Sequence, residues 1–142
     1  MLLLMEVTYS NGKESQSLYH NYANETALLG DFETKLGQAM KAEAFKAELL
    51  IAFDHTGKIL NHAYTQKEDV TLSPRLVWIT SDSEGEHENL QKYSDMNETM
   101  ANYHIRRGAS MKGTDLAIMT MAIDGTSVAS VDYWVRQDEA EA

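Results

Sequence analysis

The chain contains no cysteine and only one proline among its 142 residues. Without cysteine it has no disulfide bonds, thiolate metal sites or cysteine nucleophiles. The scarcity of proline, together with a hydrophobic content of 43%, argues for a folded globule and against a disordered chain. From the chain length we expect one domain over residues 1–136. We expect residues 137–142, which are mostly acidic or alanine, to form a disordered tail.

Positive charge is also scarce, because 12 lysines and arginines stand against 22 acidic residues and leave a net charge of −10. Binding to nucleic acid or to an anionic membrane needs cationic side chains, so we expect neither interaction. No apolar run approaches the roughly 20 residues that a membrane-spanning helix needs. The apolar start over residues 1–5 is too short for a secretory signal. We therefore expect a cytoplasmic protein.

Sequence motifs that announce a reaction are missing as well. There is no phosphate-binding loop, dinucleotide-binding glycine motif, nucleophile elbow or zinc-protease motif. The five histidines are scattered along the chain, so we expect no metal site and no cofactor. These absences favour a noncatalytic protein, and a small enzyme without a recognisable motif is the alternative.

The most informative stretch covers residues 115–135, where two apolar runs flank Asp124–Gly125. An Asp-Gly pair between apolar runs predicts a β-hairpin with a two-residue turn. With that turn, Met119 faces Ser130 across the hairpin. Both sides of the hairpin are then largely apolar, whereas a half-solvated strand should alternate with polar residues. We infer that both sides are covered, one by helices and the other by a second layer, a partner subunit or a ligand.

One carboxylate interrupts this apolar hairpin. With the predicted turn, Asp132 lies on the same side as Met119 and Trp134, and a carboxylate there must be paired, hydrogen-bonded or close to water. Trp134 offers a π surface to a cation. The sequence thus predicts a site for a small apolar or cationic ligand, formed by Asp132, Trp134, Met119 and Tyr103. The alternative is an aspartate at the sheet edge that simply faces water.

Arg106, Arg107 and Lys112 make the only cluster of basic residues. They form a candidate anion-binding site. The structural alternative is that they complement the negative end of a helix dipole, since the spacing of a phosphate-binding loop is not present.

Periodicity of the apolar residues predicts the remaining elements. We expect a hairpin over residues 2–22 turning at Asn11–Gly12, a helix from about residue 24 to 46, a hairpin over 47–66, a strand over 72–80, an acidic loop over 81–86, and a second helix from about 86 to 107. This order predicts the α+β class, with an antiparallel sheet built from hairpins and two amphipathic helices packed on one face.

These observations favour a noncatalytic binding or interaction module. We expect a homo-oligomer, specifically a dimer, because twofold dimers are the commonest oligomers and the second apolar face of the last hairpin needs a cover. A small-molecule ligand in the predicted site is the other expected partner. An acidic protein that imitates nucleic acid and binds another protein is a further alternative.

Overall fold

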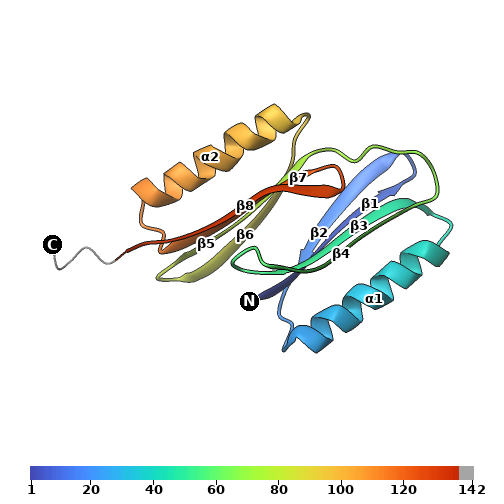
Figure 1. The fold of residues 1–142 in the computed structure, drawn as a ribbon, viewed down its shortest axis with the longest axis horizontal. Helices are drawn as coiled ribbons and strands as arrows, with labels where there is room; N and C mark the ends of the chain where they lie inside the picture. The colour runs from blue at the N-terminus through green and yellow to red at the C-terminus, as the bar shows by residue number, and fades with distance from the viewer. Residues whose placement is uncertain (138–142) are drawn as a thin grey trace. The chain divides into compact units, whose positions relative to one another are not determined.

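The computed structural model describes residues 1–137, and the chain divides into two compact units, Met1–Leu72 and the residues from Ser73 onward. Each unit consists of two hairpins with a helix between them (Figure 1). The first unit contains β1 (Leu2–Ser10), β2 (Lys13–Tyr19), α1 (Glu25–Lys41), β3 (Phe45–Asp54) and β4 (Ile59–Gln66). The second unit contains β5 (Arg75–Asp82), β6 (Gly85–Lys92), α2 (Met96–Lys112), β7 (Ala117–Asp124) and β8 (Ser127–Val135).

Each unit forms one four-stranded sheet, with strand order β2-β1-β3-β4 in the first and β6-β5-β7-β8 in the second. All neighbouring strands are antiparallel. The predicted α+β class with hairpin-built antiparallel sheets is therefore confirmed, but the strands divide between two sheets, and each sheet carries one helix. The single domain over residues 1–136 stays a prediction, and residues 138–142 of the predicted tail lie outside the described residues. In the part of the chain that the structure describes, no helix is long and apolar enough to cross a membrane.

Both helices begin at a side chain that accepts a hydrogen bond from the first turn. The Asn24 side chain accepts from the Ala27 backbone N–H at 2.8 Å, and Asp95 accepts from the Glu98 N–H at 2.7 Å. Such caps satisfy an amide group that has no partner within the helix. The predicted start of the first helix is confirmed. The predicted second helix over residues 86–107 is wrong at its start, since α2 begins at Met96.

The acidic stretch after β5 forms a hairpin instead of a helix start. Residues 85–92 make strand β6, which pairs with β5 at the edge of the sheet. Gly85 has a φ of +127° at the turn, and the Asp82 side chain accepts from the Glu84 backbone N–H at 2.8 Å. Most side chains of β6 are polar and exposed. An edge strand of this composition has no apolar alternation, so the sequence pattern did not reveal it.

The last hairpin turns at Gly125–Thr126, one residue later than predicted. Ala129 is an extra residue in β8, which makes a β-bulge between the pairs formed by Ala122 and Ile123. A one-residue change in register exchanges the two faces of a strand. As a result Thr120, and not Met119, lies on the same face as Asp132.

The same bulge occurs in the first unit, where the register shifts between Ala52 and Phe53 of β3. Both strands end in similar residues, Ala-Phe-Asp in β3 and Ala-Ile-Asp in β7. Leu4 faces Ala52 in the first sheet, and Leu76 faces Ala122 in the second. The two units thus repeat one arrangement, strand–strand–helix–strand–strand, with matching caps and bulges.

This correspondence exposes a difference between the two helices. Counted from the N-caps, four matching positions of α1 and α2 face their sheets. In α1 these positions hold only apolar residues: Leu28, Phe32, Leu36 and Ala39. In α2 they hold residues with a polar group: Thr99, Tyr103, Arg107 and Ser110. Phe32 packs on Leu4, Leu50 and Ala52 in the first core. Tyr103 packs on Leu76 and Ala122 in the second.

Two glycine substitutions test this backbone description. We expect Gly85→Ala to lower the free energy of unfolding by about 1–3 kcal/mol, because an L side chain is strained at its φ of +127°. Gly30→Ala, inside α1, should raise it by about 0.5–1 kcal/mol, because alanine favours a helix and its Cβ would meet no atom within 4 Å. Urea unfolding of both variants measures the two effects. A stabilised Gly85→Ala protein would contradict the β5–β6 turn.

Candidate functional site

Two acidic side chains lie on the helix-covered face of the first sheet. Glu6 belongs to β1 and Glu48 to β3. Glu48 pairs with Thr8, two residues beyond Glu6 in β1, so the two carboxyl groups come from diagonal neighbours. Side chains as long as glutamate reach each other across such a diagonal. Only 1% of Glu48 is exposed.

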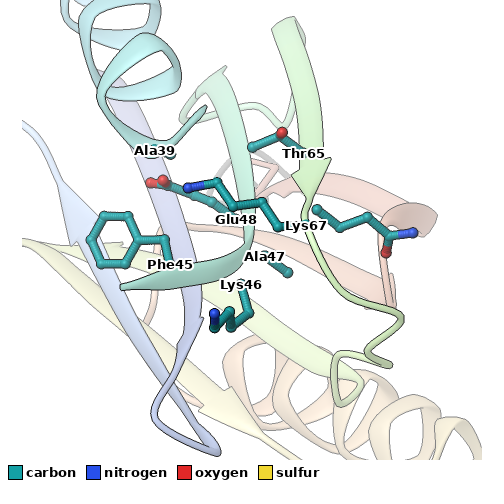
Figure 2. A pocket seen from close by; sticks show the side chains of 8 residues that line it. Ala39, Phe45, Lys46, Ala47, Glu48, Thr65 and Lys67 are labelled. Carbon is teal, nitrogen blue, oxygen red and sulfur yellow. The ribbon is translucent and has the colours of Figure 1, made fainter. Parts of the chain in front are cut away.

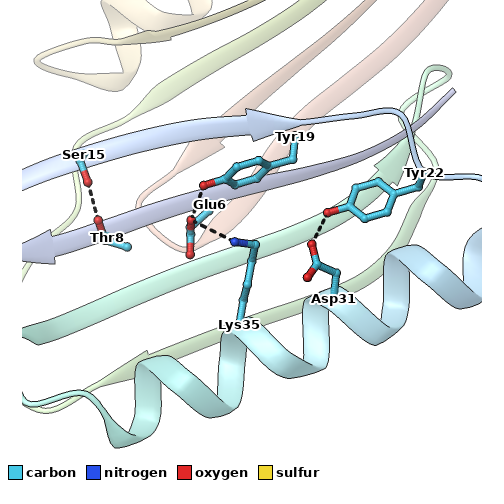
Figure 3. A network of polar contacts seen from close by, with 7 residues as sticks. All are labelled: Glu6, Thr8, Ser15, Tyr19, Tyr22, Asp31 and Lys35. Atoms are coloured by element: carbon cyan, nitrogen blue, oxygen red, sulfur yellow. Dashed lines mark hydrogen bonds and ion pairs between the residues drawn. The ribbon is translucent and has the colours of Figure 1, made fainter.

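Glu6 has its own polar partners, which Figure 3 shows. The Tyr19 hydroxyl donates a hydrogen bond to Glu6 Oε1 at 3.0 Å, and Lys35 Nζ from α1 lies 3.9 Å from the same oxygen. The Lys35 ammonium group also lies 4.4 Å from the centroid of the Tyr19 ring. One cation and one hydroxyl therefore compensate the negative charge of Glu6.

Glu48 is different, because no donor among the described residues reaches either of its carboxyl oxygens. Burial, and then hydrogen bonding with Glu6 and repulsion from its charge, raise the pKa of Glu48 to about 9, while Lys35 acts in the opposite direction. Two ionised carboxylates cannot bond to each other, but a protonated Glu48 can donate its O–H to Glu6. At neutral pH the pair therefore shares one proton.

The Glu48 side chain also lines a shallow crevice at the surface of the first unit (Figure 2). Two lysines line the crevice with it, and both have partners. Lys67 Nζ donates to the backbone oxygen of Ala42, and Lys46 Nζ lies 3.3 Å from Glu68. The remaining lining residues are Ala39, Phe45, Ala47, Thr65 and Gln66. The crevice thus presents one neutral acid between lysines that already have partners.

In the second unit the structure brings together two residues of the predicted ligand site. The Tyr103 hydroxyl donates to Asp132 Oδ2, and Ser130 Oγ donates to the Tyr103 hydroxyl oxygen at 3.1 Å. Tyr103 is 1% exposed, whereas Asp132 is exposed. Burial, and then the hydrogen bond to Asp132, raise the pKa of Tyr103 to about 12. Tyr103 therefore stays protonated and keeps donating at neutral pH.

The other two residues of the predicted site do not join them in the expected way. Met119 lies on the opposite face of β7. Trp134 shares the face of Asp132, but the Arg136 guanidinium lies 5.0 Å from its ring centroid. The Arg106 guanidinium likewise lies 4.5 Å from the Trp78 ring centroid. Both tryptophan rings therefore already contact a cation of the chain itself.

The three basic residues of the predicted anion site are not brought together. Arg106 is exposed and lies over Trp78, and Lys112 is exposed in the last turn of α2. Arg107 occupies an α2 position that faces the sheet and is half-buried. Its Nη1 atom is buried and has no hydrogen-bond partner among the described residues. Of the three, Arg107 is the one with a free donor pointing inward.

Sequence reasoning missed Arg136, which binds the end of α2. Its Nε donates to the backbone oxygen of Asp115, and its Nη2 donates to those of Ser110, Met111 and Gly113, at 2.9 to 3.2 Å. A cation at these carbonyl groups complements the helix dipole. From the sequence alone, this role is the structural interpretation of Arg106, Arg107 and Lys112.

Sequence reasoning also missed Thr120 and Glu48. Thr120 is fully buried, pairs with Asp132 across the hairpin, and has an Oγ1 without a partner among the described residues. The signal for Glu48 was available, because it is a single acid inside the apolar run of β3. Thr120 gave no such signal, since threonine is common in strands.

Among residues 1–137, no three histidine, aspartate or glutamate side chains lie close enough to hold a metal ion.

No protein-family model, curated protein or solved structure compared with this chain matches it.

The shared proton of Glu48 predicts a pH dependence of stability. Its pKa rises from 4.5 to about 9 on folding, so the folded chain keeps a proton that the unfolded chain releases in that interval. The contribution of this proton to the free energy of unfolding is complete below about pH 4.5 and is lost as pH rises through about 9. The free energy of unfolding falls by at most about 1.4 kcal/mol per pH unit in this interval. In Glu48→Gln we expect this slope to flatten, as measured by urea unfolding from pH 5 to 9. Glu43→Gln, which removes an exposed carboxyl group, is the control, and equal slopes in both variants would contradict the shared proton.

Proposed function

We propose that the chain is a noncatalytic binding module that takes a small molecule in its second unit, between α2 and β8. The site is a group of polar residues that we call the α2–β8 cluster: Tyr103, Arg107, Thr120, Ser130 and Asp132. The observation that carries the proposal is that Thr120 Oγ1 and Arg107 Nη1 are buried without a partner among the described residues. Each such atom costs about 1–3 kcal/mol. A ligand group that accepts hydrogen bonds removes this cost.

The first unit supports this proposal as an internal comparison. The positions that match Tyr103, Thr120 and Asp132 hold Phe32, Leu50 and Ala63. The same arrangement of strands and helix therefore forms with apolar side chains there. The fold does not require polar side chains at these three positions of the α2–β8 cluster, which favours a role for them in binding.

Access to solvent also supports a site here. Asp132 is exposed, and Trp134 on the same face is half-buried. Polar groups that converge beside an aromatic ring and reach the surface are typical of ligand sites.

A thermal-shift screen tests the binding proposal with aromatic cations, neutral apolar compounds and oxyanions. A ligand that binds only the folded chain stabilises it by about 2.7 kcal/mol at 100 times its Kd. We expect at least one class to raise the Tm of the wild type, and the shift to shrink in Tyr103→Phe, which loses the hydroxyl that holds Asp132. Asp124→Asn, at an exposed aspartate of the same hairpin, should keep the full shift. Failure of all three classes to raise the Tm would refute the proposal.

A small enzyme remains the alternative, and the Glu6–Glu48 pair is the observation in its favour. One carboxyl group that holds a proton beside another that accepts it can act as a general acid and base. A reacting atom must come within hydrogen-bond reach of the acid, yet Glu48 is almost fully buried. We therefore favour binding over catalysis.

We also expect a cytoplasmic protein, because a chain without cysteine needs no oxidising compartment.

We also propose that the chain forms a twofold dimer through β8. This strand lies at the edge of its sheet and contains no lysine, arginine or proline. Such residues protect an exposed edge against pairing with another strand. On the face opposite α2, Val131 and Val135 are 37% and 49% exposed. An antiparallel pair of β8 strands is self-complementary, as a twofold interface requires.

Light scattering coupled to size exclusion tests the dimer. We expect the wild type to have twice the mass of the chain, and Val131→Lys to shift it toward the monomer, because like charges would face each other across the paired edges. Ile105→Lys, which places the same charge at an exposed apolar position of α2, should stay dimeric. A wild type that remains monomeric at high concentration would rule out this interface.

A further inference from the structure

We infer that the ligand group held by the α2–β8 cluster is an oxyanion, a carboxylate or a phosphate, bound by Arg107 and Thr120. This inference rests on the proposed function of the cluster. It assigns a chemical class to the ligand, and that class differs from the small apolar or cationic ligand that the sequence predicts.

The contacts on either side of Arg107 define its place over the sheet. Tyr103, one turn earlier on the same helix face, reaches Ser130 and Asp132 of β8. Ser110, three residues later, donates from Oγ to Asp115 at 2.9 Å, just before β7 begins. Arg107 therefore lies over the intervening part of the sheet, where Thr120 pairs with Asp132 and Ile118 with Trp134.

The unpartnered groups at this place are donors. The guanidinium group donates only, in a planar arrangement that matches the oxygens of carboxylates and phosphates. The Thr120 hydroxyl can donate to the same ligand. A positive charge that is partly withdrawn from water is costly without a counter-charge, and no ion pair of Arg107 occurs among the described residues. An oxyanion supplies the acceptor and the counter-charge together.

A cation fits the same place poorly. The Trp134 ring is in contact with Arg136, whose guanidinium is held by four backbone carbonyl groups of the α2 end. A cationic ligand on the same face of that ring would compete with Arg136 and would also meet the charge of Arg107.

Asp132 opposes an oxyanion, because its carboxylate lies beside Thr120 on the same face. Its Oδ2 accepts a hydrogen bond from Tyr103, and the residue is exposed, so water screens its charge. If Arg107 binds an external oxyanion, removing the charge of Asp132 tightens binding. If Arg107 only balances the charge of Asp132, the protein binds no oxyanion, whether or not the charge of Asp132 is removed.

Tryptophan fluorescence reports on this unit alone, since the two tryptophans of the chain, Trp78 and Trp134, both belong to it. The full-length chain is titrated with sodium acetate and with inorganic phosphate, against sodium chloride at equal ionic strength. We expect saturable binding of one or both oxyanions by the wild type. Arg107→Met should weaken it about tenfold or more, which is the effect of losing one hydrogen bond to a charged group. Asp132→Asn should tighten it severalfold.

Lys112→Met is the matched control, because it removes the same charge from the same helix at an exposed position. It should bind like the wild type. Arg107→Lys keeps the charge and restores part of the affinity, which separates binding from folding if Arg107→Met lowers the Tm. Equal weakening by Arg107→Met and Lys112→Met would show general charge attraction and would overturn the site.

The outcome also separates the two proposals. Acetate binding alone assigns a carboxylate ligand, and phosphate binding alone assigns a phosphate. No saturation by either oxyanion, together with a Tyr103-dependent thermal shift by a neutral or cationic compound, would refute the oxyanion and leave the binding module standing. No response to any compound in either experiment would refute both.

Discussion

One contact, made once in each unit, joins the helix to its sheet. An aromatic ring, Phe32 in α1 and Tyr103 in α2, is buried between its helix and the two central strands of its sheet. Isolated helices of this length and isolated hairpins are marginal in water. A buried aromatic side chain supplies a large apolar area, and its truncation costs about 3–5 kcal/mol.

The repeated arrangement leaves room for different chemistry in each copy. In the first unit, the polar groups of the helix-covered face are Glu6 and Glu48, which share a proton because the site is too dry for two charges. In the second unit they are the α2–β8 cluster around Tyr103, and the matching positions of the acid pair hold Trp78 and Ile118. The two units therefore place their buried polar side chains at different points on the helix-covered face.

The net charge of the chain says little about these local fields. An overall charge of −10 suggests a ligand of positive charge, yet three arginines lie in or next to the α2–β8 cluster. Arg136 binds the carbonyl groups at the end of α2 and Arg106 covers Trp78, so both are engaged by the protein. Arg107 is the remaining cation, and its Nη1 atom is buried without a partner among the described residues. The electric field of charges within a few ångströms governs which ligand charge a partly buried site prefers, because solvent screens more distant charges.

The sequence by itself determined the local features, since these depend on neighbours along the chain. It predicted the first hairpin with its turn at Asn11–Gly12, the start of α1 and the α+β class. It did not predict β6, whose polar edge position leaves no apolar period. Only the tertiary structure decided which residues face Asp132, because the single extra residue Ala129 exchanges the faces of β8 and has no signature of its own. The same holds for the place of Glu48 diagonal to Glu6 and for the binding of Arg136 to Ser110, 26 residues away, because both depend on contacts between segments that are distant in the sequence.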